Sequence, residues 1–113
     1  MPTPDELYDE ADRLKDDGKP EEAAAKLNEL LAQQEAYPLA HSALAVLYTK
    51  LKRPDDAIKH ARRACELEPN DPFSYTALSV TCQRVFTLTN NHEYIHLAED
   101  AMAKARMLQG GMH

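Results

Sequence analysis

Apolar side chains recur along this chain at intervals of three and four residues, which is the spacing of one face of an α-helix. In the first third of the sequence this pattern predicts two helices, over residues 4–17 and about 20–34. Their buried stripes are Leu7, Ala11 and Leu14, and then Ala23, Leu27, Leu30 and Leu31. Thr3 and Glu6 have the spacing of a capping box at the start of the first helix. Gly18 marks its end, because glycine tolerates the left-handed backbone found there.

The next two helices differ in how much of their surface is apolar. From Leu39 to Lys50 almost no polar side is left, which predicts a helix covered on nearly all sides, with one face open to a groove. From Pro54 to Glu68 the inward residues are Ala57, Ile58, Ala61, Ala64 and Cys65. Outward lysines and arginines form a basic patch, which is either a solvated outer face or a contact site for an acidic partner: Lys50, Lys52, Arg53, Lys59, Arg62 and Arg63.

The chain contains an internal repeat. Pro4, Pro38 and Pro72 are each separated by 34 residues, and Lys19-Pro20-Glu21-Glu22-Ala23 corresponds to Arg53-Pro54-Asp55-Asp56-Ala57 at the same offset. A fixed period of this length predicts stacked supersecondary units rather than one globular core.

The central unit is similar to the tetratricopeptide repeat. The resemblance rests on its small and apolar positions and on the proline after its second helix: Leu44, Ala45, Tyr48, Ala57, Ala61, Ala64 and Pro69. It implies an all-α fold of three stacked antiparallel helix hairpins in a right-handed α-solenoid. We therefore expect one domain over residues 1–113, with unit one at 4–37, unit two at 38–71 and unit three at 72–108. Few glycines and many Ala, Leu, Glu and Lys residues agree with helix nearly throughout.

Unit three departs from the period, because Ala98 follows its counterpart Ala57 by 41 residues. The seven added residues correspond to about two helical turns, so the last hairpin is expected to be elongated. Asn90 or Asn91 would cap its final helix. That helix has an apolar face and a polar face, so we expect it to close the array, with residues 109–113 as a frayed tail.

Charge and hydropathy limit the classes of partner. The net charge of −6 opposes binding to a nucleic acid backbone. The charge is uneven: unit one carries eleven acidic and four basic side chains, or −7, whereas unit two is +1 and unit three is neutral. No apolar run is long enough to cross a bilayer, and the N-terminal residues lack the pattern of a secretion signal. We expect a soluble cytoplasmic protein that binds no membrane.

Two groups of reactive residues are also present. Cys65 and Cys82 lie on apolar helix stripes, and we interpret them as buried core residues rather than a disulfide or redox pair. The segment from His92 to His96 matches H-E-x-x-H, a zinc hydrolase motif. Both histidines fall on the polar face of the last helix and no third ligand is identified. We therefore predict no catalytic residue, metal site or cofactor, and keep a metal-dependent hydrolase only as a remote alternative.

The predicted function is peptide or protein binding. The resemblance implies a concave groove lined by the first helix of each unit: Tyr8, Asp12 and Lys15, then Leu39, Ser42, Val46 and Thr49, then Phe73, Thr76, Val80 and Gln83. The family's carboxylate clamp is not reproduced, because Tyr8, Asp12, Ser42 and Val46 occupy the matching positions. Apolar residues such as Leu39 and Phe73 favour an interaction surface. Self-association through the same groove is the second hypothesis, so the protein would be a scaffold in either case.

Overall fold

Proline occupies the first position of five helices, where its missing N–H costs no hydrogen bond and its fixed φ fits the helix. The computed structural model describes residues 1–110, and in that range it contains six α-helices and no strand. The helices are α1 (Pro4–Asp16), α2 (Pro20–Gln33), α3 (Pro38–Lys50), α4 (Pro54–Leu67), α5 (Pro72–Thr89) and α6 (Glu93–Gly110). Within the same range no helix is both long and apolar enough to cross a membrane.

Local signals explain most helix ends. The capping box is present, since Thr3 Oγ1 accepts from the Glu6 N–H and a Glu6 carboxylate oxygen accepts from the Thr3 N–H. Gly18 has φ +75° in the turn after α1, as its position predicts. Lys52, which stands 34 residues later, has φ +59° in the turn after α3. The same turn therefore recurs with the period of the sequence, although only the first copy has a glycine.

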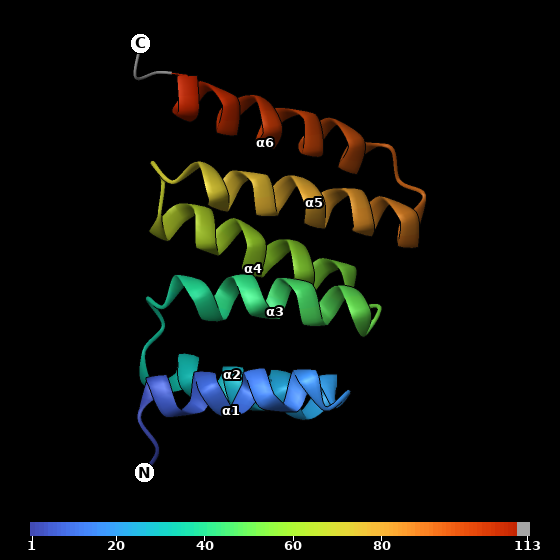
Figure 1. The fold of residues 1–113 in the computed structure, drawn as a ribbon. Helices are drawn as coiled ribbons and strands as arrows, with labels where there is room; N and C mark the ends of the chain where they lie inside the picture. The colour runs from blue at the N-terminus through green and yellow to red at the C-terminus, as the bar shows by residue number, and fades with distance from the viewer. Residues whose placement is uncertain (111–113) are drawn as a thin grey trace.

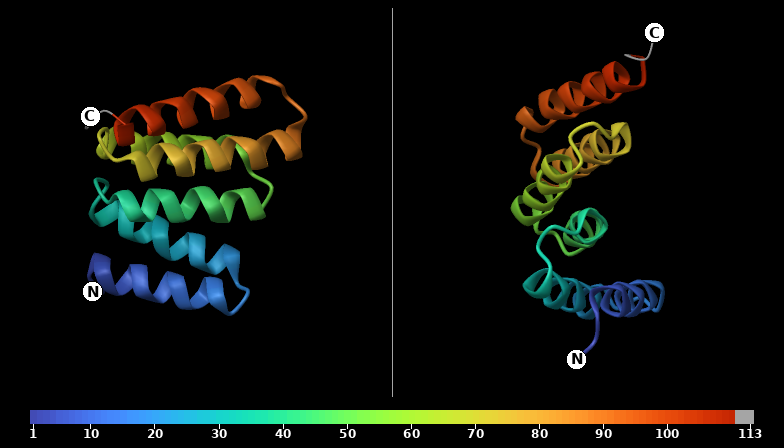
Figure 2. Two further views of the ribbon diagram at one scale, coloured as in Figure 1. Left: turned by 45° about the horizontal axis from the view of Figure 1, so that its top comes forward. Right: turned by 90° about the vertical axis from the view of Figure 1, so that its left-hand side faces the viewer.

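The helices stack as an ordered array along the chain. Each helix packs on the next, most extensively within the pairs α1–α2, α3–α4 and α5–α6 (Figure 1). α3 also contacts α5 directly, so the first helices of successive pairs lie next to each other in that part of the array. In Figure 2 the helices follow in sequence from α1 at one end to α6 at the other.

The core is made of aliphatic side chains and closely packed alanines. Leu7, Leu27, Leu30, Leu44 and Leu47 are almost entirely removed from solvent. The predicted alanines of α4, namely Ala57, Ala61 and Ala64, are also buried. Cys65 and Cys82 are buried and free, in agreement with their interpretation as core residues. The Cys65 thiol donates to the Ser74 carbonyl oxygen at 3.3 Å.

Two predictions about burial and helix ends need correction. The helix from Leu39 was expected to be covered on nearly all sides, but the Leu39 side chain is 60% exposed because it lies in the first turn of α3, beyond the cover of its neighbours. The last helix was expected to end at residue 108, whereas α6 continues through Gln109 to Gly110. Glutamine is a good helix former, so nothing stops the helix before the glycine pair. The remaining tail residues, 111–113, lie outside the described residues.

The last two helices are the longest. α5 and α6 have 18 residues each, compared with 13 or 14 in the four helices before them. Asn90 ends α5 with φ +59°, and the Asn91 side-chain oxygen accepts from the Glu93 N–H at the start of α6. Of the two predicted caps, Asn91 therefore caps α6.

Candidate functional site

A pocket lies between α1 and α3, with part of α2 at its floor. Its volume is about 240 Å³, and most of its lining is apolar. Six of the predicted groove residues line it: Tyr8, Asp12, Lys15, Leu39, Ser42 and Val46. Ala11, Leu27, Ala43 and Leu47 complete it, and sequence reasoning did not identify them as site residues. We call this hollow the α1–α3 pocket.

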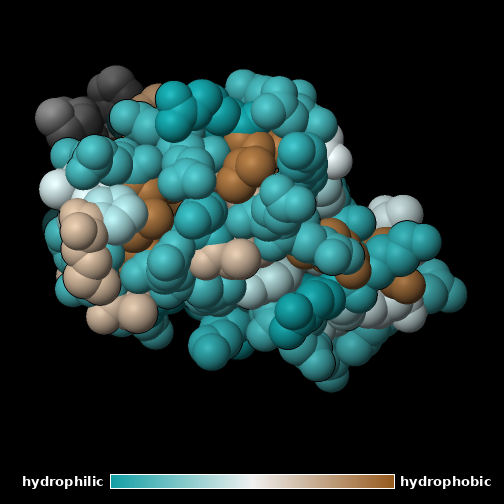
Figure 3. Space-filling view, turned by 90° about the horizontal axis from the view of Figure 1, so that it is seen from below, coloured by the Kyte–Doolittle hydropathy of each residue, from teal (hydrophilic) through white to brown (hydrophobic). Residues whose placement is uncertain are grey.

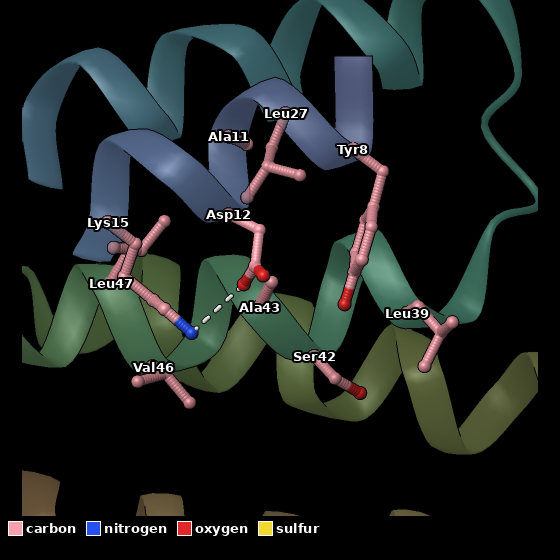
Figure 4. Close-up of a pocket in the computed structure, with 10 residues that line it drawn as sticks. All are labelled: Tyr8, Ala11, Asp12, Lys15, Leu27, Leu39, Ser42, Ala43, Val46 and Leu47. Carbon is pink, nitrogen blue, oxygen red and sulfur yellow. Dashed lines mark ion pairs between the residues drawn. The ribbon is translucent and has the colours of Figure 1, made fainter. Parts of the chain in front are cut away.

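One side of the α1–α3 pocket carries an ion pair. Lys15 Nζ lies 3.1 Å from Asp12 Oδ1, and Figure 4 shows this pair in front of the apolar side chains of α3. Both side chains are substantially exposed. The hydrogen bond from Asp12 and its negative charge raise the pKa of Lys15. The Asp12 charge is therefore partly satisfied within α1.

A second pocket lies between the N-terminal ends of α3 and α5. Its volume is about 540 Å³, and we call it the α3–α5 pocket. It shares Leu39 and Ser42 with the α1–α3 pocket, so the two hollows form one continuous groove. The predicted residue Phe73 lines it and is 76% exposed. Glu68 and Asp71 add two carboxylates to its wall.

Four predicted residues lie along the same helices with different roles. The Thr49 and Thr76 hydroxyls donate to the carbonyl oxygens four residues earlier, those of Ala45 and Pro72. Their hydroxyls are therefore used within the helix. Val80 on α5 is partly exposed, and Gln83 lines a hollow between α5 and α6.

The groove side of α1 is tied to the segment before α3. The Tyr37 hydroxyl donates to Asp5 Oδ1 at 2.7 Å, and the Tyr37 and Tyr8 rings lie 5.9 Å apart. This hydrogen bond is the main reason that the pKa of Tyr37 is raised to about 12. Because a neutral hydroxyl is the donor, Asp5 keeps its negative charge. Viewed from the α1–α2 end, the surface is mostly hydrophilic, with only separate hydrophobic areas (Figure 3).

Comparison with protein families decides the classification. The chain matches the sequence model of the tetratricopeptide repeat over residues 8–72, which is more than half of its length. The chain belongs to the tetratricopeptide repeat family. The family predicted from the period and the alanines is thus confirmed. None of the curated proteins compared with the chain is a match.

Tetratricopeptide repeats generally mediate protein–protein interaction and are typically not catalytic. The coarse prediction of an all-helical repeat protein is therefore confirmed. Its groove residues are on the first helix of each pair, and the two pockets bring seven of them together: Tyr8, Asp12, Lys15, Leu39, Ser42, Val46 and Phe73.

The H-E-x-x-H segment lies at the opposite end of the chain from this groove. His92 and His96 are both exposed, and the His92 ring lies 5.3 Å from the Phe86 ring. Among residues 1–110, the structure contains no group of three or more His, Cys, Asp or Glu side chains suited to a metal ion. The geometry therefore offers the hydrolase hypothesis no third ligand in the described part of the chain.

The basic patch on α4 is already partly engaged. Arg63 binds both carboxylate oxygens of Glu35 at 2.7 Å, and it also contacts Glu66 at 3.1 Å. These bonds raise the pKa of Arg63 and lower that of Glu35. Arg53 likewise pairs with Asp56 at 2.7 Å. Since two of its arginines already have carboxylate partners, the patch is less available to an acidic partner than its sequence suggests.

Proposed function

We propose that this protein is a non-catalytic binding module that takes a peptide segment of another protein in the groove formed by the α1–α3 and α3–α5 pockets. Exposed apolar side chains along a continuous hollow support this proposal. Leu39 and Phe73 leave most of their surface in water, and large exposed apolar groups that line a hollow are typical of interaction sites.

We further infer that the array consists of three hairpin units with the boundaries expected from the sequence, 4–37, 38–71 and 72–108, the last being elongated and the stack right-handed. The lengths of α5 and α6 support the elongation. The recurring left-handed turns at Gly18 and Lys52 support the boundary between the first two units. A cytoplasmic location stays a prediction from the sequence.

The period indicates the chemistry of the ligand. Residues at equivalent positions of the three units form two rows along the groove, and both rows read acidic, apolar, apolar: Asp5, Leu39 and Phe73 in one, and Asp12, Val46 and Val80 in the other. A complementary segment would place a basic side chain at α1 and apolar side chains at α3 and α5. Glu68 and Asp71, together with the charge of −7 on unit one, favour a basic ligand further.

Synthetic peptides of equal length test this assignment. One set combines leucines with lysines, a second combines leucines with glutamates, and a third combines serines with lysines. Fluorescence anisotropy should show binding only for the first set, weakening as salt screens the charges. Equal binding of the second set would contradict the charge assignment, and equal binding of the third would contradict an apolar site.

Point variants locate the site on the surface. Leu39→Glu and Phe73→Glu should both prevent binding of the leucine–lysine peptides, because a charge in a desolvated apolar site costs several kcal/mol. Met107→Glu on α6 is the matched control, since Met107 is 62% exposed and lines neither pocket. If Met107→Glu reduces binding as much as Phe73→Glu, the groove is not the site.

Self-association is the alternative use of the same surface. Sedimentation velocity over a range of concentrations separates it from peptide binding. A monomer that binds the leucine–lysine peptides supports the proposal. A dimer that Leu39→Glu converts to monomer, together with no peptide binding, would replace it with a homo-oligomeric scaffold.

A further inference from the structure

Two histidines are buried in direct contact between α3 and α4. His41 is 3% exposed and His60 is 9% exposed. Their Nδ1 atoms lie 2.9 Å apart, and the rings are stacked with centroids 5.2 Å apart. At that distance one nitrogen must donate a hydrogen and the other must accept it. The contact therefore requires a defined number of protons.

The neighbour of His41 determines which nitrogen carries each hydrogen. His41 Nε2 lies 2.8 Å from the backbone carbonyl oxygen of Glu35, which can only accept. His41 Nε2 therefore carries a hydrogen, and Nδ1 of neutral His41 is the acceptor. It follows that His60 donates through Nδ1–H and has a lone pair on Nε2.

The four nitrogens can hold two or three hydrogens without breaking the contact. A third hydrogen on His60 Nε2 leaves the Nδ1–H···Nδ1 bond in place. A fourth would have to go on His41 Nδ1, and it would place two N–H groups head to head within 2.9 Å. The doubly protonated pair is therefore incompatible with the observed geometry.

The same histidines fasten the segment that joins α2 to α3. Glu35 in that segment accepts from His41 through its carbonyl oxygen, and one of its carboxylate oxygens lies 3.2 Å from His41 Nε2. The carboxylate also binds Arg63 of α4 through two bonds. His41, His60, Glu35 and Arg63 thus form one connected group linking the segment to α3 and α4.

We propose that the His41–His60 contact is a pH-sensitive latch, which holds the α2–α3 segment against α4 and opens when both imidazoles are protonated. The latch does not depend on a ligand in the groove, so it can be tested separately from the proposed function. Its opening frees the Glu35 segment while α5 and α6 stay packed.

Charged and titratable groups surround His60 on every side, and their effects oppose one another. From α3, His41 and Tyr48 lie against its ring. From α4, Lys59 disfavours its positive charge and Asp56 favours it. Glu35 also favours the charge, and Arg63 lies in the same hollow, as does Tyr94 of α6. Burial is the largest effect and, with the charges on His41 and Lys59, lowers the pKa of His60 to about 4.

The sign of the pH effect follows from this lowered pKa. The folded state binds fewer protons than the unfolded state between the ordinary histidine value of 6.5 and about 4. The stabilisation is therefore complete above pH 6.5 and is lost as the pH falls towards 4. At pH 5 the open form should be favoured on the order of thirtyfold more than at neutral pH, because that ratio follows from the two pKa values.

Nitrogen-15 NMR of the four described imidazoles His41, His60, His92 and His96 provides the first test. At pH 7.5 His41 should be protonated on Nε2 and His60 on Nδ1, whereas the exposed His92 and His96 should show averaged tautomers. The opposite tautomers, or averaging at His41 and His60 as well, would overturn the latch. This test uses the unmodified chain and does not depend on a variant that folds.

Amide hydrogen exchange provides the second test. After correction for intrinsic rates, amides of residues 35–44 should exchange on the order of thirtyfold faster at pH 5 than at pH 7, with little change in α6. His60→Gln retains a donor towards His41 but cannot titrate, so it should remove most of this acceleration. His96→Gln is the control and should preserve it. Uniform acceleration along the chain, or the same acceleration in His60→Gln, would refute the proposal.

Discussion

Replacing Ala61 by leucine should destabilise the protein by about 1–3 kcal/mol, because the added carbon atoms enter a filled interior. Ala61 is 4% exposed and lies on α4, which packs against both α3 and α5. Ala57 and Ala64 on the same helix are buried as well. Protein interiors are packed as densely as organic crystals, so the new side chain can be accommodated only by moving a helix or by adopting a strained rotamer.

The repeat itself supports this magnitude. Leu27 stands 34 residues before Ala61 and is also buried, so a leucine fits at this position when the adjoining helices are spaced for it. The structure has an alanine on α4, and its neighbours are placed accordingly. Unfolding entropy near 2.1 cal/mol/K per residue gives about 0.24 kcal/mol/K for the chain, so 1–3 kcal/mol corresponds to roughly 4–13 °C in Tm.

Thermal unfolding followed by far-ultraviolet circular dichroism measures this effect, with urea unfolding as the second measurement. Ala103→Leu on α6 is the matched control, because Ala103 is exposed and the same atoms are added in water. Its effect should be within about 0.5 kcal/mol. If Ala61→Leu melts at the wild-type temperature, α4 is not closely packed at Ala61 and our account of the alanine positions is wrong.

Three further predictions concern the backbone, the groove and the exposed histidines. Gly18→Ala should cost about 1 kcal/mol in urea unfolding, since no atom lies within 4 Å of the added Cβ but φ is +75°; the chain should still fold, as Lys52 adopts the same conformation. Val46→Glu should prevent leucine–lysine peptide binding without loss of helix content, and retained affinity would mean that the peptide lies elsewhere. Replacing His92 and His96 together by alanine should leave unfolding and peptide affinity unchanged, and loss of a tightly bound stoichiometric zinc would contradict this.

Much of the fold is predictable from local sequence signals. Proline at the first helical position and the turn at Gly18 define helix starts and an end to within one or two residues. These signals act through the backbone of the residue that carries them, so no tertiary information is needed. The 34-residue period is equally visible, because it compares the chain with itself.

The parts that could not be predicted depend on which side chains meet across helices. His41 was interpreted as one position in an apolar helix, and His60 was not considered, since neither has a distinctive local pattern. Their contact becomes visible only when α3 and α4 are placed side by side. Glu68 and Asp71 were missed for a similar reason, because the groove was expected on the first helices alone and these residues precede α5.

The groove and the histidine latch use opposite sides of α3, and this arrangement predicts that they are coupled. Leu39 and Ser42 face the groove while His41, between them in sequence, contacts His60 of α4. A peptide that contacts both α1 and α3 binds best when these helices keep their relative placement, which the latch favours. By reciprocity, the peptide must then lower the pH at which the latch opens. Titration of the His60 imidazole by NMR, with and without a saturating leucine–lysine peptide, measures this shift. A downward shift in the complex supports coupling, whereas an unchanged titration with saturated peptide would show that the two sides of α3 act independently.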